Sequence, residues 1–102
     1  NIMALNITTQ LTTEDGFVLP NSYGRVAVID NVEGKSLQCY AEIYKDEAAF
    51  VAGAKPIDFR NIKLVKQVAY DRAAEGSDIL ALSHVVIKEL LETQEIDAEI
   101  LL

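Results

Sequence analysis

The chain has one cysteine, no long hydrophobic run and no cluster of basic residues, and each absence excludes a class of protein. The single cysteine, Cys39, rules out an internal disulfide framework and a cysteine zinc site. No apolar run approaches the length of a membrane-spanning helix, and no signal-peptide core is present. We therefore expect a soluble protein without a membrane partner, which is cytoplasmic in the cell that produces it.

Basic residues are few, since nine Lys and Arg stand against sixteen Asp and Glu, for a net charge of −7. Such a surface repels phosphate groups, so no nucleic-acid partner is expected. Half of the residues are hydrophobic and a quarter are charged, which is a globular rather than a disordered composition. The length of 102 residues predicts a single domain over residues 3–102. Asn1 and Ile2, ahead of Met3, are predicted to be a vector-derived remnant.

The stretch 77–94 predicts one long amphipathic helix. Ser77 and Asp78 both suit an N-cap, and neither glycine nor proline follows before residue 102. Spaced at 3.6 residues per turn, the hydrophobic positions form a stripe over about half of the circumference. These positions are Ile79, Leu80, Leu82, Val86, Ile87, Leu90 and Leu91. We expect this helix to lie on a sheet, with Lys88, Glu89 and Glu92 in water.

Alternation of polar and apolar residues predicts the strands that precede the helix. Leu5–Leu11 alternates, and Phe17–Leu19 after the Asp15-Gly16 turn is either a weak strand or an anchored loop. The continuous apolar run within Tyr23–Asp30 predicts a strand that is covered on both sides. Ser36–Tyr44 alternates most cleanly, and it is expected to form a hairpin with the strand before it.

A short helix is predicted directly after this hairpin. Asp46 suits its N-cap, Gly53 can take the left-handed conformation at its end, and Pro56 prevents its continuation. Phe50 is the residue expected to anchor this helix to the sheet.

The remaining segments predict two more strands. Ile57–Tyr70 is rich in β-branched residues, which favour a strand. The alternation of its apolar residues shifts by one position near Arg60-Asn61, which predicts either a β-bulge or a strand that serves two surfaces. Asp71–Gly76 is a polar, acidic connection, and Ile96–Leu102 alternates as a final strand. The predicted order is β-β-β-α-β-α-β, an α+β fold whose mostly antiparallel sheet packs against the long helix and carries one short helix.

Two groups of residues raise the question of chemistry. Cys39 and His84 could act as a nucleophile and a base, with Asp78 orienting the imidazole. However, Cys39 lies on the apolar phase of its strand, where a buried thiol is ordinary, and His84 is predicted to be half-exposed at the border of the helix. We therefore predict no catalytic residue and no enzyme activity.

The second group consists of the carboxylates Asp71, Glu75 and Asp78, which could attract a hard cation. They lack the residue order of a calcium loop, so a solvated acidic turn is the expectation and no metal site is predicted. No glycine-rich loop precedes a helix, and no cofactor is expected.

An interaction surface is the better-supported prediction. Tyr40 and Tyr44 share the outward phase of their strand with Gln38 and Glu42, and exposed tyrosines beside charges are typical of protein interfaces. Arg60 and Asn61 belong to the same prediction, because the phase change there would suit a strand shared with a neighbouring subunit. With a single covering helix, a sheet edge or face is also expected to stay free for pairing.

Three segments carry a resemblance. They are Ser22-Tyr23-Gly24-Arg25-Val26, the run from Ala41 to Ala48, and Gly53-Ala54-Lys55-Pro56-Ile57. Their order resembles that of small bacteriophage and prophage structural proteins: a Tyr-x-Arg strand, a strand that ends before an acidic-Ala-Ala-Phe turn, and a Gly-x-x-Pro-Ile restart. The resemblance spans the middle and end of the chain. It implies a virion or tail-associated subunit that works by assembling, and it attaches no catalytic residue.

Taken together, the sequence predicts a non-enzymatic structural protein that forms a homo-oligomer or packs with other virion subunits. The alternative is a small cytoplasmic adaptor or regulatory module that docks through the helix margin around His84 and Lys88. A third possibility is a small hydrolase that uses Cys39 and His84.

Overall fold

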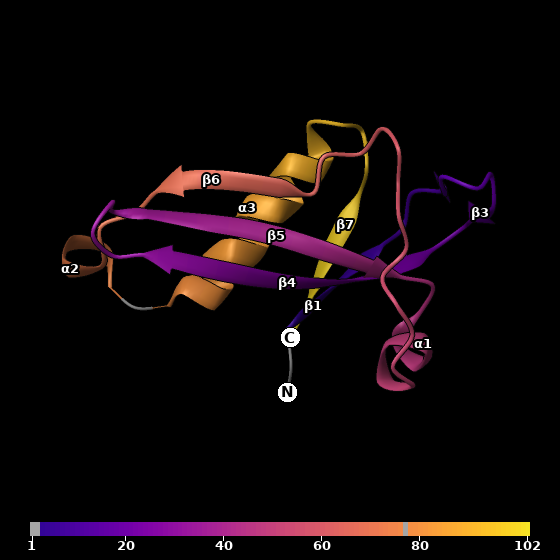
Figure 1. Cartoon of the computed structure of the whole chain (residues 1–102), viewed down its shortest axis with the longest axis horizontal. Coiled ribbons are helices and arrows are strands. Elements are labelled where there is room, and N and C mark those ends of the chain that lie inside the picture. Colours follow the sequence, from indigo (N-terminus) through magenta and orange to yellow (C-terminus); the bar gives the residue numbers. More distant parts are fainter. Residues whose placement is uncertain (1–2, 77) are drawn as a thin grey trace.

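A five-stranded sheet with one long helix across it forms the body of the protein in the computed structural model, which describes residues 3–76 and 78–102 (Figure 1). The sheet has the order β6-β5-β4-β1-β7, and every neighbouring pair is antiparallel. Its strands are β1 (Ala4–Ile7), β4 (Ser22–Asn31), β5 (Ser36–Tyr44), β6 (Val65–Ala69) and β7 (Ala98–Leu101). The helix is α3 (Ile79–Glu92). The predicted α+β fold is therefore confirmed.

Smaller elements lie at the two ends of the body. A separate two-stranded sheet pairs β2 (Leu11–Thr12) with β3 (Val18–Leu19), and it projects at one end as a hairpin (Figure 1). The short helices are α1 (Glu47–Val51) and α2 (Arg72–Glu75). The observed order is close to the predicted one: the first strand is divided in two, the segment left as a weak strand or an anchored loop forms the strand β3, and α2 is added.

The hairpin of β4 and β5 follows the predicted alternation. The two strands are paired from Tyr23 with Tyr44 to Asn31 with Ser36. The apolar phase of β5 is buried toward α3; it consists of Leu37, Cys39, Ala41 and Ile43. The polar phase faces the other side, so this part of the prediction is confirmed.

The hydrophobic core lies between the sheet and α3. Leu5 from β1, Ile43 from β5 and Ile87 from α3 are all fully buried. Gly24 allows the strands to pack closely there, because a Cβ at this position would lie 3.3 Å from the Cβ of Leu5. This closely packed layer supplies most of the apolar burial that stabilises the fold.

The predicted helix stripe packs against the core, with Ile79, Leu82, Val86 and Leu90 partly buried, but the most buried part of the helix lies to one side of it. The buried residues of α3 are Ser83, His84, Ile87 and Leu91, whereas Leu80 is 46% exposed. Ser83 Oγ donates to Leu80 O (2.7 Å), and Nδ1 of His84 lies 2.7 Å from the same oxygen. Because these polar groups find a partner within the helix, they can be buried, and the helix is rotated toward them.

Two strand predictions were too long. Leu5–Leu11 is divided, since the chain leaves β1 after Ile7 and enters the projecting hairpin at Leu11. Within Ile57–Tyr70, only β6 is a strand. The preceding residues form an irregular segment that packs Phe59, Ile62 and Leu64 against the core without pairing as a bulged strand.

The prediction that the Tyr23–Asp30 strand is covered on both sides was also wrong. Val26 and Val28 pack against the core, but Ile29 is 55% exposed. The apolar run continues onto a face that no helix of the described residues covers at this position.

The observed helix caps agree with those predicted from the sequence. Asp46 caps α1, because its Oδ1 accepts from Ala49 N at 2.7 Å, and Gly53 has a φ of +84°. Asp78 caps α3 by accepting from Ala81 N at 3.2 Å. The alternative cap, Ser77, lies outside the described residues. Each aspartate satisfies a backbone amide that the helix itself leaves free.

Candidate interaction surface

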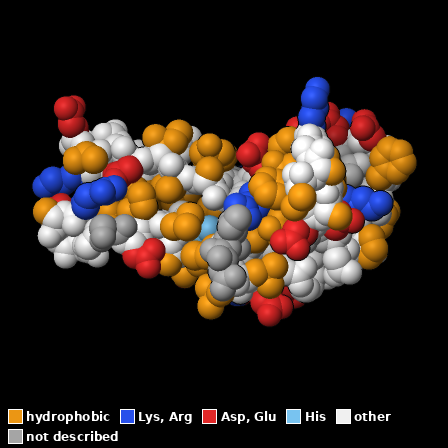
Figure 2. Space-filling view, turned by 90° about the horizontal axis from the view of Figure 1, so that it is seen from below, with side chains coloured by type: hydrophobic (Ala, Val, Ile, Leu, Met, Phe, Trp, Pro, Cys, Tyr) orange, Lys and Arg blue, Asp and Glu red, His pale blue; other side chains and the backbone are white. Residues whose placement is uncertain are grey.

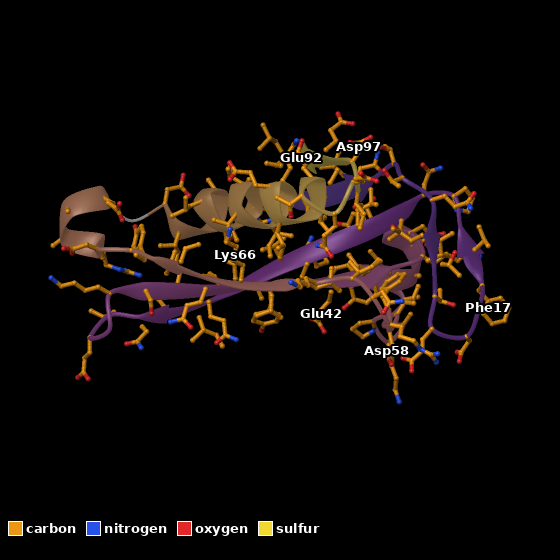
Figure 3. All side chains as sticks on the ribbon, turned by 90° about the horizontal axis from the view of Figure 1, so that it is seen from above. Phe17, Glu42, Asp58, Lys66, Glu92 and Asp97 are labelled. Atoms are coloured by element: carbon orange, nitrogen blue, oxygen red, sulfur yellow. The ribbon has the colours of Figure 1, made fainter. Side chains whose placement is uncertain are left out.

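The side of the five-stranded sheet away from α3 is exposed over much of its area, and we refer to it as the open face. Alternation along the paired strands places six neighbouring residues on it: Ile29, Gln38, Tyr40, Glu42, Val65 and Gln67. Viewed along the sheet, Glu42 points away from α3, whereas Lys66 lies on the side of α3 (Figure 3). An antiparallel sheet can leave one face to solvent, so this surface is compatible with a stable monomer.

Three of the predicted interface residues meet on the open face. Gln38 and Glu42 are exposed, and Tyr40 between them is half-buried. Across the ladder, Tyr40 is paired with Ala27 of β4 and Val65 of β6. The tyrosine ring therefore has small or aliphatic neighbours on both sides and polar ones along its own strand.

Tyr44 was expected on the same exposed surface, but it is only 7% exposed. Phe50 of α1 packs against it edge to face at 5.0 Å between ring centroids, and Tyr23 lies 6.0 Å from Phe50. Arg25 stacks over the Phe50 ring at 4.6 Å, and its Nη1 donates to the Tyr23 hydroxyl at 3.2 Å. This aromatic cluster closes one end of the open face.

The surroundings of Tyr44 change its acidity. Burial, which is the larger cause, and the negative charge of Glu42 raise the pKa of the Tyr44 phenol, while Arg25 opposes them. The buried ring is therefore held in its neutral form well into the alkaline range.

Arg60 and Asn61 lie apart from the tyrosines. Both are exposed in the irregular segment before β6, where they line a hollow beside the β2–β3 hairpin. Arg60 Nη2 lies 3.7 Å from Glu14 Oε1 of that hairpin. The phase change at these positions falls in an irregular segment, and their role in an interface stays a prediction.

The projecting hairpin exposes hydrophobic residues that were not predicted as interface. Phe17 is 71% exposed on its outer side (Figure 3), and Val18 is 53% exposed. A hollow of 780 Å³ lies between the hairpin and the segment that contains Ile57 and Asp58. The available signal was the Asp15-Gly16 turn, which places Phe17 at the tip of the hairpin.

Cys39 and His84 make no hydrogen bond with each other among the described residues. Cys39 is fully buried, and burial raises the pKa of its thiol. His84 was predicted to be half-exposed but is 1% exposed. Because Leu80 O can only accept, Nδ1 of His84 carries the proton, and its Nε2 has no partner within residues 3–76 and 78–102. Asp78 is occupied as a helix cap.

The three carboxylates considered for a cation all serve as local hydrogen-bond acceptors. Asp71 accepts from Ala73 N, Glu75 accepts from Asp71 N, and Asp78 caps α3. No group of three or more metal-ligating side chains occurs in the described part of the chain.

On the face seen in Figure 2, hydrophobic side chains are distributed along the length of the molecule, with charged groups between them. Within the described residues, no helix combines the length and the apolar character needed to cross a bilayer.

Searches of protein-family models, of curated proteins and of solved structures find no match to the chain.

Proposed function

We propose that this protein is a non-enzymatic structural subunit, of bacteriophage or prophage origin, which assembles with copies of itself or with other virion or tail proteins. The observation that carries the proposal is the open face, where Tyr40, Ile29 and Val65 lie together and no helix within residues 3–76 and 78–102 covers them. A tyrosine with aliphatic neighbours and a polar margin is a composition that favours protein association.

Further support comes from the shape of the molecule. The structure extends 43 Å by 28 Å by 20 Å, and its hairpin projects with Phe17 exposed at the tip. A projecting arm and an uncovered sheet face give one chain two kinds of contact, as an assembling subunit requires. The phage origin depends on the resemblance of the three sequence segments.

Light scattering coupled to size exclusion tests the self-assembly form of the proposal. We expect the mass of the wild-type protein to rise above that of the monomer as concentration increases. Tyr40→Lys should reduce this rise, because it places a charge at the centre of the open face. Val32→Lys, at an exposed position on the β4–β5 turn, makes the same change in net charge and is the matched control, so it should assemble as the wild type does. A wild-type protein that stays monomeric at every concentration would leave only assembly with other proteins.

One observation favours the adaptor alternative. Leu80 and Val85 of α3 are 46% and 42% exposed, so the helix offers some apolar surface near Lys88. His84 does not contribute to that surface, because it is buried. Capture from the native host separates the two proposals: an adaptor should recover a non-structural protein, and the recovery should be lost in Leu80→Glu.

A further inference from the structure

The hollow of 780 Å³ beside the projecting hairpin has apolar walls. They are formed by Phe17, Val18 and Leu19 of the hairpin and by Pro56 and Ile57 of the segment after α1. Figure 3 shows Phe17 and Asp58, one from each wall, at the same end of the molecule. Exposed apolar surface that is bordered by charged residues is typical of an interaction site.

The margin of the hollow is mostly acidic. The carboxylates of Glu14, Asp15 and Asp58 line it, and Lys45 supplies the only ammonium group among its described residues. Glu14 Oε1 lies 3.7 Å from Arg60 Nη2, whereas Asp15, Asp58 and Lys45 form no ion pair within the described part of the chain. Such a margin attracts a cationic group and repels an acidic one.

Hydrogen bonds hold the two walls in place. Glu14 N donates to Asp58 O at 3.1 Å, which joins the hairpin to the segment after α1, and Ile57 N donates to Ile43 O of β5 at 2.8 Å. Because the hollow is formed in the free chain, little ordering of its walls is needed when a partner binds.

The hollow suits a polypeptide better than a small polar molecule. Small-molecule sites present several convergent polar groups. Thr13, however, is the only uncharged polar side chain among the described residues that line this hollow, and its Oγ1 already accepts from Phe17 N at 3.0 Å.

Strand β3 offers main-chain groups to such a partner. Thr13 N donates to Phe17 O, and Thr12 is paired with Val18, so the N–H and C=O groups of Val18 point away from β2. A chain that lies along β3 can bond to these groups while its side chains contact the walls.

We propose that the hollow binds a short segment of a partner protein, in which an apolar side chain lies next to a lysine or an arginine. The apolar side chain packs against the walls, and the cation lies near Asp15 and Asp58. The inference rests on the proposed function, since the partner is another subunit of the assembly, and it names what the hairpin contacts. A second copy of this chain suits an acidic margin poorly, because its net charge is −7.

A library of random linear peptides displayed on yeast tests the proposal. Wild-type protein is the bait, and a variant with Val18→Ser, Asp15→Asn and Asp58→Asn removes the peptides that bind elsewhere. The recovered peptides should combine leucine, valine or phenylalanine with a neighbouring lysine or arginine. Failure to recover any peptide, or recovery of acidic ones, would overturn the inference.

A recovered peptide that carries a fluorescent label then tests the apolar wall by fluorescence anisotropy. Val18→Ser should weaken binding about fivefold or more, because it removes apolar surface from the wall. Val32→Ser is the matched control, since Val32 is 64% exposed on the β4–β5 turn and does not line the hollow. The control should bind the peptide as the wild type does.

The same measurement tests the acidic margin. Asp15→Asn with Asp58→Asn should weaken binding about threefold or more at low ionic strength, and the difference should narrow as salt is added. Glu33→Gln with Glu89→Gln makes the same change in net charge at exposed positions outside the hollow and should leave the affinity unchanged. Urea unfolding of every variant checks that the fold is retained.

Each contrary outcome identifies what is wrong. If Val18→Ser and Val32→Ser bind the peptide equally well, the hollow is not the site. If the aspartate variant binds as tightly as the wild type at every salt concentration, the basic partner is wrong. If Val18→Ser abolishes self-association in light scattering, the hollow holds a second copy instead. Tyr40→Lys tests the proposed function on the open face, so the two proposals can fail separately.

Discussion

The two faces of the five-stranded sheet are formed by the same strands but have different roles. In β5, Leu37, Cys39 and Ile43 are fully buried under α3, whereas Gln38 and Glu42 on the other side are exposed. The covered face holds the fold together through close apolar packing. The open face contributes little to that packing and is free to contact other molecules.

The comparison is sharpest for one pair of isoleucines on neighbouring strands. Ile43 is fully buried toward α3, and Ile29 is 55% exposed on the open face. Ile43→Ala should lower the free energy of unfolding by about 2–5 kcal/mol, because it leaves a cavity in the core. Ile29→Ala should change it by about 0.5 kcal/mol or less. Urea unfolding measures both, and equal losses would show that the open face also stabilises the monomer.

A smaller loss of stability is expected in the aromatic cluster of Tyr23, Tyr44 and Phe50, which lies at one end of the open face. Phe50→Ala removes the ring that covers Tyr44 and should cost roughly 1–3 kcal/mol of unfolding free energy. Val51→Ala is the matched control, because Val51 lies in the same helix and is 76% exposed. The control should be nearly neutral in the same urea titration. An unchanged stability in Phe50→Ala would mean that α1 does not anchor to the sheet.

The raised pKa of Tyr44 predicts a pH dependence of stability. The phenol ionises near pH 10 in the unfolded chain and at a higher pH in the fold, so its contribution is fully present below about pH 10. That contribution is lost as pH rises through the higher, folded pKa. Urea unfolding between about pH 9 and pH 11 should therefore show a steeper fall for the wild type than for Tyr44→Phe. Parallel curves would contradict the burial of this ring.

The last contrast involves reactivity and no change in stability. Cys39 is buried on the covered face with a raised pKa, so iodoacetamide should alkylate it very slowly in the folded protein and readily in urea. Rapid modification of the folded protein at neutral pH would revive the hydrolase hypothesis with Cys39 and His84.

Local patterns predicted much of the fold. The alternation within Ser36–Tyr44 identified both the strand and its buried phase, and Asp46 identified a helix start. The limits of the long helix were correct to within two residues. These features depend on neighbouring residues, so sequence spacing is sufficient to find them.

The errors came from contacts between distant segments. Tyr44 has the phase of an exposed residue, and only the later packing of Phe50 covers it. His84 is buried because Leu80 O pairs with its Nδ1, which no hydrophobicity pattern encodes. The segment before β6 has apolar residues because it packs as an irregular chain. The position of β1 between β4 and β7 also depends on contacts between distant segments, so this strand order cannot be derived from local spacing.

Hydrogen–deuterium exchange of dilute and concentrated protein tests most directly whether the uncovered parts of the sheet make the assembly. The account predicts that the outward amides of β6 beside the open face, those of Val65, Gln67 and Ala69, exchange quickly in dilute protein and slowly in concentrated protein. The amides of α3 should exchange at the same rate in both. Protection that is unchanged on β6 while the protein assembles, or protection that appears on α3 instead, would contradict it.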